Sequence, residues 1–185
     1  TEGHINAKKG EGKYLKRISV TEAGHPIPDE ESVEGSEKIL EILRKARKGD
    51  IVIYAVSGGA SALNTLPGPG LTLEDIQEVN HLLFFERGAS MPETNAVRTT
   101  CLTILNTKHE RFVGDATCIT LLTTETPPNP HRPDPRHVQR PRNADAFQHA
   151  VEILKKYQIW NQVPQYVQEY LKKGDPNYGP LELRR

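Results

Sequence analysis

Sulfur and net charge are scarce in this sequence. The 185 residues include two cysteines, Cys101 and Cys118, and a single methionine. Two cysteines are too few for a disulfide framework, so we expect reduced thiols in a cytoplasmic protein. Lysine and arginine together number 24, as do aspartate and glutamate. A chain without net charge has no overall field that attracts nucleic acid or an anionic membrane, and we expect neither partner.

Long apolar runs are also missing. No stretch approaches the roughly 20 apolar residues that cross a bilayer, and no charged segment followed by an apolar one marks a secretory leader. The chain begins with Thr1, and its only methionine is Met91, so we expect it to be part of a longer protein. With 36% hydrophobic and 26% charged residues, residues 1–185 have the composition of one globular domain.

The sequence does contain an alternation of strand and helix patterns. Apolar runs rich in β-branched residues predict strands at 51–56, covered on both faces, and at 117–123. Apolar spacing and capping residues predict helices from Asp29 to Gly49, from Thr72 to Gly88, from Pro92 to about Leu105, and at 144–157 and 163–172. This order indicates an α/β layered fold with a mostly parallel sheet flanked by helices.

A glycine-rich loop follows the strand predicted at 51–56. Its residues are Ser57, Gly58, Gly59, Ala60 and Ser61, called the 57–61 loop below. Consecutive backbone N–H groups without large side chains suit a phosphate or carboxylate, and open α/β sheets bind ligands at this edge. A tight turn that needs glycine only for its backbone gives the same pattern. The loop has neither the Walker A lysine nor a GxGxxG fingerprint.

Two other patterns suggest different chemistries. The stretch "GASAL" matches a nucleophile elbow without its last glycine, so Ser61 is a candidate nucleophile of a serine hydrolase. His131, Asp134 and His137 are spaced by three, as metal ligands can be. A proline-rich segment offers no helical face on which that spacing converges, which favours a solvated loop.

Two places in the sequence carry positive charge that could bind an anion. Arg98 lies four residues after Thr94 on a predicted helix, where it is either an anion clamp or a surface ion pair. Segment 124–143 has six prolines and four arginines and follows a predicted strand. Since that strand ends at the ligand edge of the sheet, we expect the segment to start beside the 57–61 loop, with residues 125–129 bordering a cleft.

Five stretches form an ordered set along the chain: "EAGHPIPDEES" (22–32), "VSGGASAL" (56–63), "LPGPGLTLED" (66–75), "RGASMPETNAVR" (87–98) and "DAFQHAVEIL" (145–154). Together they resemble the N-terminal domain of the type-2 glycerate kinases, an ATP-dependent family whose members are sometimes named hydroxypyruvate reductases. The stretches occur in the family's order and at similar separations, over nearly the whole chain.

The resemblance implies a Rossmann-like α/β domain paired with a C-terminal domain, with glycerate, ATP and Mg²⁺ in the cleft between them. It further implies that the 57–61 loop binds a phosphate or carboxylate. The implied site residues are Arg98 and Glu125 as catalytic groups, with Glu93, Asn95 and His25 lining the cleft and Asp29 beside His25. Assembly as a homodimer is left open.

The chain departs from the family at two places. After Arg98 the family continues with Lys-His, where this chain has Thr99 and Thr100. After the second strand the family has a Ser-Asp-Val segment and a Gly-Asp pair, for which this chain offers Glu125 and Asn129. Phosphoryl transfer depends on charge neutralisation and metal positioning. The alternative hypothesis is therefore a catalytically deficient ligand-binding or assembly module that retains the fold.

Overall fold

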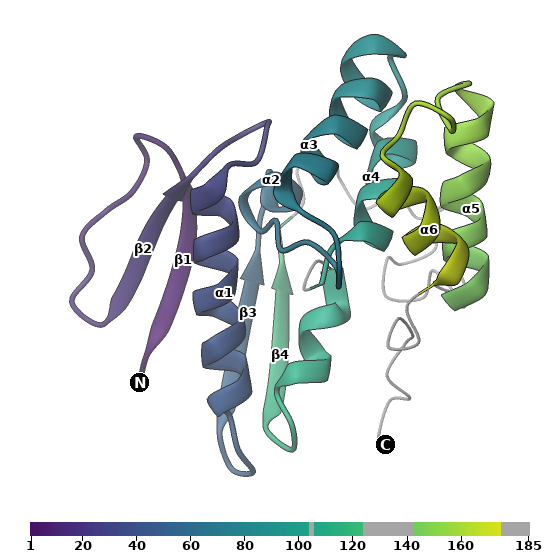
Figure 1. The fold of residues 1–185 in the computed structure, drawn as a ribbon. Coiled ribbons are helices and arrows are strands. Elements are labelled where there is room, and N and C mark those ends of the chain that lie inside the picture. Colours follow the sequence, from purple (N-terminus) through teal and green to yellow (C-terminus); the bar gives the residue numbers. More distant parts are fainter. Residues whose placement is uncertain (104–105, 124–142, 175–185) are drawn as a thin grey trace, which may run out of the picture.

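The computed structural model describes residues 1–103, 106–123 and 143–174 (Figure 1). In chain order, its elements are β1 (Gly3–Lys8), β2 (Ile18–Ala23), α1 (Glu30–Lys45), β3 (Ile51–Val56), α2 (Ala60–Leu63), α3 (Leu73–Asn80), the π-helix η1 (His81–Glu86), α4 (Met91–Cys101), the 3₁₀ segment η2 (Asn106–Phe112), β4 (Thr117–Leu122), α5 (Asn143–Lys156) and α6 (Gln165–Lys173).

The strands form two parallel pairs, β1 with β2 and β3 with β4. Helix α1 packs on both β1 and β2, and its Leu43 shares an apolar cluster with Tyr54 of β3. The same helix therefore covers both pairs, as Figure 1 shows. Parallel strands flanked by helices confirm the predicted α/β fold class.

The carboxyl ends of β3 and β4 meet at one edge, next to α2 (Figure 1). The Thr123 N–H donates to the Val56 carbonyl at 2.9 Å, so the chain leaves β4 beside the start of the 57–61 loop. The strand that precedes segment 124–143 therefore ends beside the loop. Segment 124–143 itself, with Glu125, Asn129 and the candidate metal ligands His131, Asp134 and His137, lies outside the described residues apart from Asn143, and its expected course stays a prediction.

One face of the β3–β4 pair is covered. Tyr54 of β3 packs with Leu43 of α1 and Val113, and its ring stacks on His109 with 3.7 Å between ring centroids. Burial raises the pKa of Tyr54 to about 12. This face therefore holds an apolar core with an aromatic pair at its centre.

The opposite face of the pair is open among the described residues. Ile51 and Ile53 are 67% and 64% exposed, and Ile119 and Leu121 of β4 are also exposed. The prediction that strand 51–56 is covered on both faces is therefore wrong among the described residues, which cover only one face. A continuous apolar run indicates that both faces of a strand tolerate burial, but it does not specify the element that covers each of them.

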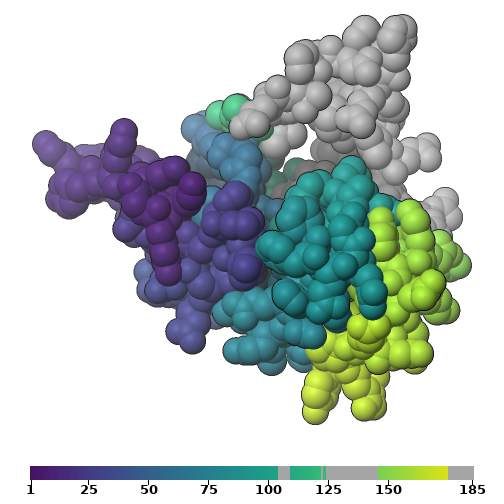
Figure 2. All heavy atoms as spheres, turned by 90° about the horizontal axis from the view of Figure 1, so that it is seen from above, coloured from purple at the N-terminus to yellow at the C-terminus, as the bar shows by residue number. Residues whose placement is uncertain are grey.

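A larger core lies among the helices. Its largest fully buried apolar side chains come from α3, η1, α4, α5 and α6 and the segments beside them: Ile76, Leu83, Val97, Leu102, Leu154, Ile159 and Val167. Figure 2 views the molecule from above and shows α6 (yellow) against the teal surface of the middle helices, with the N-terminal segment (purple) projecting on the other side. No described helix has both the length and the apolar character needed to span a membrane.

Local sequence signals set the helix starts, as predicted. Asp29 caps α1: its carboxylate accepts the Ser32 N–H at 3.0 Å, while the Ser32 hydroxyl oxygen accepts the Asp29 N–H at 3.1 Å. Thr72 and Asp75 form the same reciprocal pair at the start of α3. Both are capping boxes, in which each side chain satisfies a backbone donor that the helix leaves free.

Two predicted helix ends are wrong and one is confirmed. Helix α1 ends at Lys45 because Ala46 is extended, and Gly49 (φ +96°) belongs to the next turn. The helix after Thr72 widens at His81 into the π-helix η1, which ends at Glu86, and Gly88 (φ +61°) follows it as predicted. Helix α4 ends at Cys101 rather than near Leu105, because the chain then pairs with residues 66–68: the Cys101 carbonyl accepts the Gly68 N–H at 2.7 Å.

Candidate functional site

The 57–61 loop turns sharply between β3 and α2. Gly59 has φ +86°, and a Cβ atom placed on it would lie 3.0 Å from Cδ2 of the His25 ring. Both the left-handed backbone and the close ring favour glycine here. The structure thus brings the predicted site residue His25 against the loop, and it leaves Ser57 and Gly58 exposed to solvent.

Arg98 lies behind the loop, on α4. Its Nη1 donates to the Ser61 hydroxyl at 2.7 Å, and its Nε donates to Asn80 Oδ1 at 3.0 Å. The side chain is 8% exposed. Of the two sequence hypotheses for Arg98, the surface ion pair does not fit, because the residue is buried and neither of its two hydrogen-bond partners among the described residues is charged.

The charge of Arg98 has no counterion among the described residues. No carboxylate in this part of the chain forms an ion pair with it, and burial lowers its pKa. Removing a guanidinium from water without an opposite charge is unfavourable. An anion placed at the 57–61 loop would supply that opposite charge, so the arrangement is suited to anion binding.

Asn80 is a member of this cluster that sequence reasoning missed. It is 5% exposed, and its Nδ2 has no hydrogen-bond partner within the described structure. Thr94, one helical turn before Arg98, is fully buried with an unpartnered Oγ1, and Asn95 has an unpartnered Oδ1. Buried polar atoms are normally satisfied, and a ligand with polar groups is one way to satisfy them.

Glu93 is engaged elsewhere in this structure. Its carboxylate accepts hydrogen bonds from Lys156 Nζ at 2.5 Å, the Ser90 hydroxyl at 2.6 Å and the Tyr157 hydroxyl at 2.8 Å. These bonds lower the pKa of Glu93 to about 2, and the bond from Lys156 has the largest effect. The carboxylate therefore ties α4 to α5, and its predicted part in the site stays a prediction.

Asp29 shapes the turn that carries His25. Its carboxylate accepts the Gly24 N–H at 2.8 Å and forms an ion pair with Lys9 Nζ at 2.7 Å. Burial by itself would raise the pKa of Asp29, but the hydrogen bonds from Lys9, Gly24 and Ser32 hold it well below its usual range. Asp29 thus acts on the loop through the 24–29 turn.

The competing sequence patterns find little support in the geometry. The Ser61 hydroxyl is bonded to Arg98, and a guanidinium does not accept the proton that a serine nucleophile must lose. Thr100, at one of the family's departures, is buried and donates to the Val97 carbonyl at 2.6 Å. Among the described residues, no group of three His, Cys, Asp or Glu side chains is placed to hold a metal ion.

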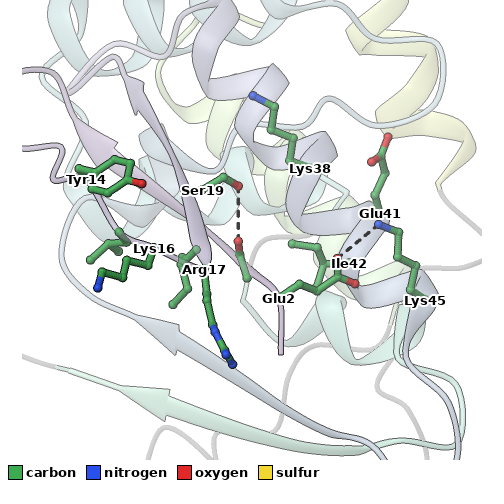
Figure 3. Close-up of a pocket in the computed structure, with 12 residues that line it drawn as sticks. Glu2, Tyr14, Lys16, Arg17, Ser19, Lys38, Glu41, Ile42 and Lys45 are labelled. Carbon is green, nitrogen blue, oxygen red and sulfur yellow. Dashed lines mark hydrogen bonds and ion pairs between the residues drawn. The ribbon is translucent and has the colours of Figure 1, made fainter.

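A separate groove of about 520 Å³ lies at the amino ends of β1 and β2 (Figure 3). Lys16 and Arg17 approach it from the segment before β2, while Lys38 and Lys45 approach it from α1. Lys38 pairs with Glu34 at 2.6 Å, and Lys45 pairs with Glu2 at 3.6 Å. The groove is thus at the opposite strand ends from the 57–61 loop, and half of its basic groups already have counterions.

The structure therefore defines a parallel α/β domain with a buried arginine at the carboxyl edge of its strands, which has no counterion among the described residues. A family model described as "Domain of unknown function (DUF4147)" matches residues 1–172. The chain belongs to this family.

Curated relatives carry the names glycerate 2-kinase and putative hydroxypyruvate reductase. A glycerate 2-kinase from Pyrococcus horikoshii is 36% identical over 180 residues, which cover 94% of this chain and 39% of the relative. A putative hydroxypyruvate reductase from Agrobacterium vitis is 32% identical, over 93% of this chain and 44% of the relative. The resemblance to glycerate kinases inferred from the motifs is thus confirmed, and the chain spans less than half the length of these relatives.

Solved structures agree on the fold. A crystal structure of a Pyrococcus horikoshii OT3 protein has a TM-score of 0.80 at 37% identity, covering 94% of this chain and 39% of the other. The crystal structure of a glycerate kinase from Thermotoga maritima has a TM-score of 0.74 at 24% identity, covering 97% and 42%. The α/β fold predicted from the alternating patterns is therefore that of known glycerate kinase domains.

Proposed function

We propose that this chain is the N-terminal domain of an ATP-dependent glycerate kinase, and that the 57–61 loop and Arg98 bind an anionic group of its substrates. The observation that carries the proposal is the buried guanidinium of Arg98, which is bonded to Ser61 and has no counterion among the described residues. The glycerate 2-kinase and glycerate kinase names of the relatives support the choice of reaction. The catalytically deficient module is not favoured.

Phosphoryl transfer needs the charge that spreads over the phosphate oxygens to be neutralised by fixed groups. Arg98 is held by two hydrogen bonds, so it does not have to reorganise when an anion arrives. Backbone N–H groups of Gly58 and Gly59 would add further donors, since Gly58 is exposed and Gly59 is partly exposed. Together these groups would fix a phosphate or carboxylate at the carboxyl edge of β3.

Other parts of the proposal rest on the relatives or on sequence alone. ATP is the expected phosphoryl donor because the relatives are named kinases. Mg²⁺ would accompany its phosphates, since Mg²⁺ is usually bound by one or two carboxylates together with substrate oxygens. Glu93, Asn95 and Glu125 as site residues, a cytoplasmic location and a homodimer all stay predictions. Since the chain spans less than half of its relatives, we expect it to bind ligand but not to transfer a phosphoryl group alone.

Calorimetric titration of the chain tests the proposal. ATP, inorganic triphosphate and glycerate are each titrated with and without magnesium, into wild type and into Arg98→Met. We expect wild type to bind at least one of these anions and Arg98→Met to lose that binding. Equal affinities in both proteins would remove Arg98 from the site. Absence of binding in wild type for all three ligands would overturn the proposed function of this domain.

A further inference from the structure

A second hollow adjoins the proposed anion site. It has a volume of about 370 Å³ and lies between α3, η1 and Ile27. Besides Ile27, it is lined by the carboxylates of Glu74 and Glu78, the amides of Gln77 and Asn80, and the rings of His81 and Phe85. No lysine or arginine lines it within the described structure. Its size is within the range of small-molecule sites.

Two chains of contacts connect this pocket to the 57–61 loop. Asn80 lines the pocket and accepts the Nε–H of Arg98, whose Nη1 donates to Ser61. Ile27 lines the pocket too, and two residues earlier the His25 ring lies against Gly59. The pocket therefore lies next to the 57–61 loop, and both connections lead to it.

Asn80 carries an unused donor at the wall between the two. Because its Oδ1 must accept the Nε–H of Arg98, its Nδ2 is directed elsewhere, and that atom is buried without a partner. Leaving a buried donor without an acceptor is unfavourable. A ligand that presents an acceptor to Asn80 would remove that penalty.

The charges of the two neighbouring sites are opposite. Glu74 and Glu78 would repel a phosphate or a carboxylate from the pocket, and they would accept hydrogen bonds from hydroxyl groups. Phe85 is 51% exposed, and its ring is supported edge-on by Phe84 at 5.1 Å and by the stacked ring of His81 at 6.0 Å between centroids. An exposed, supported ring is a stacking surface for a flat base. Arg98, by contrast, is suited to an anion.

We propose that the pocket binds the nucleoside part of a nucleotide whose phosphates lie at Arg98 and the 57–61 loop. The base stacks on Phe85, the ribose hydroxyls donate to Glu74 or Glu78, and Asn80 Nδ2 donates to an acceptor of the nucleoside. A nucleotide is the ligand class that has a neutral, hydroxylated and aromatic end joined to an anionic one. This inference rests on the proposed function and identifies which part of the domain recognises ATP.

The experiment compares two ligands that share phosphates and differ in the nucleoside. Affinities for ATP and inorganic triphosphate are measured by calorimetry for wild type, Phe85→Ala and the control Tyr166→Ala, which removes an exposed ring of α6 outside the pocket lining. We expect Phe85→Ala to weaken ATP about tenfold, as loss of one base–aromatic stack does. Triphosphate affinity should stay unchanged, and Tyr166→Ala should change neither ligand.

A second measurement on wild type does not depend on how the variants fold. Intermolecular nuclear Overhauser effects should connect the base protons of bound ATP with the Phe85 ring. If ATP binds no better than triphosphate, or if Phe85→Ala weakens both ligands equally, the nucleoside is not in this pocket and only this inference fails. If wild type binds neither ATP nor triphosphate, this inference fails, and if it does not bind glycerate either, the proposed function fails with it.

Discussion

Two regions of positive charge among the described residues differ in almost every physical respect. The groove in Figure 3 gathers Lys16, Arg17, Lys38 and Lys45 around about 520 Å³ of open space. Arg98 at the other strand ends is a single charge, 8% exposed, held by two neutral side chains. By number of charges the groove is the stronger candidate for an anion site.

The difference in solvent exposure makes Arg98 the stronger candidate instead. Exposed charges are screened by water and salt, and exposed ion pairs contribute only about 0–1 kcal/mol. The groove also lies at the carboxyl end of α1, where the helix dipole disfavours an anion. Arg98 is desolvated without a counterion among the described residues. The binding of an anion there is therefore more favourable than binding to the exposed charges of the groove. A buried unpaired charge is thus a better indicator of a binding site than several exposed ones.

Removing the charge of Arg98 should have the largest effect. Arg98→Met should weaken triphosphate binding on the order of 100-fold, because hydrogen bonds to charged groups contribute about 1.5–3 kcal/mol each. Lys16→Met, which removes one exposed charge of the groove, is the control. Calorimetric titration measures both. Comparable losses in the two variants would mean that burial does not distinguish the two regions.

Giving Arg98 a counterion should also weaken binding. Asn80→Asp keeps the acceptor for the Arg98 Nε–H and adds a negative charge, so a ligand anion no longer meets an uncompensated arginine. We expect triphosphate affinity to fall about tenfold, roughly the effect of one unfavourable charge contact. Asn161→Asp adds the same charge in the exposed turn between α5 and α6 and should have little effect. Unchanged affinity in Asn80→Asp would contradict the role assigned to the missing counterion.

A matched pair of glycines tests the loop itself. Gly59 and Gly70 have similar backbone angles, φ +86° and +82°, but only Gly59 has a ring against it. Alanine at either position should cost about 1–2 kcal/mol of folding free energy, because a side chain disfavours positive φ. Only Gly59→Ala should also displace His25 and weaken anion binding. Urea unfolding and calorimetry separate these effects, and equal binding in both variants would leave the loop without a part in the site.

Glu93 provides a smaller, pH-dependent test outside both regions. Its pKa is lowered to about 2 by Lys156, Ser90 and Tyr157, below its value of about 4.3 in an unfolded chain. A lowered folded pKa stabilises the fold above the unfolded pKa, and this contribution is lost as pH falls through the folded pKa. Glu93→Gln should therefore reduce the loss of unfolding free energy between pH 5 and pH 2. An identical pH dependence in wild type and Glu93→Gln would show that these bonds contribute nothing.

The smallest effect is expected in the groove. The double variant Lys16→Ala/Arg17→Ala removes the two basic side chains of the groove that have no ion pair among the described residues. At physiological ionic strength it should change triphosphate affinity less than about twofold, since the Debye length there is about 8 Å. Calorimetry at low and physiological salt checks this, and a loss as large as that of Arg98→Met would reassign the site to the groove.

Local patterns in the sequence predicted much of the fold. The capping box at Asp29, the strand at 51–56 and the glycine turn after it depend on residues close together in the chain, so they were recognisable without tertiary structure. Arg98 was recognised as a candidate from its motif. Its burial and its bond to Ser61, 37 residues earlier, became evident only from the packing of α4 behind the loop.

Other features depend on packing that no local pattern specifies. Asn80 contacts Arg98 across 18 residues, and an asparagine at the end of a helix has no distinctive neighbours in the sequence. The early end of α4 follows from pairing with residues 66–68, which competes with the helix that the local pattern favours. The exposed face of β3 likewise depends on which elements cover it.

Nuclear magnetic resonance can locate the anion directly. Inorganic triphosphate is added to isotope-labelled chain while the backbone amides of Gly58 and Gly59, the Arg98 Nε–H and the amides of Lys16 and Arg17 are followed together. A site built on the buried arginine predicts saturable shifts at Gly58, Gly59 and Arg98, with Lys16 and Arg17 unmoved. Saturable shifts confined to Lys16 and Arg17, with the loop and Arg98 unchanged, would contradict it.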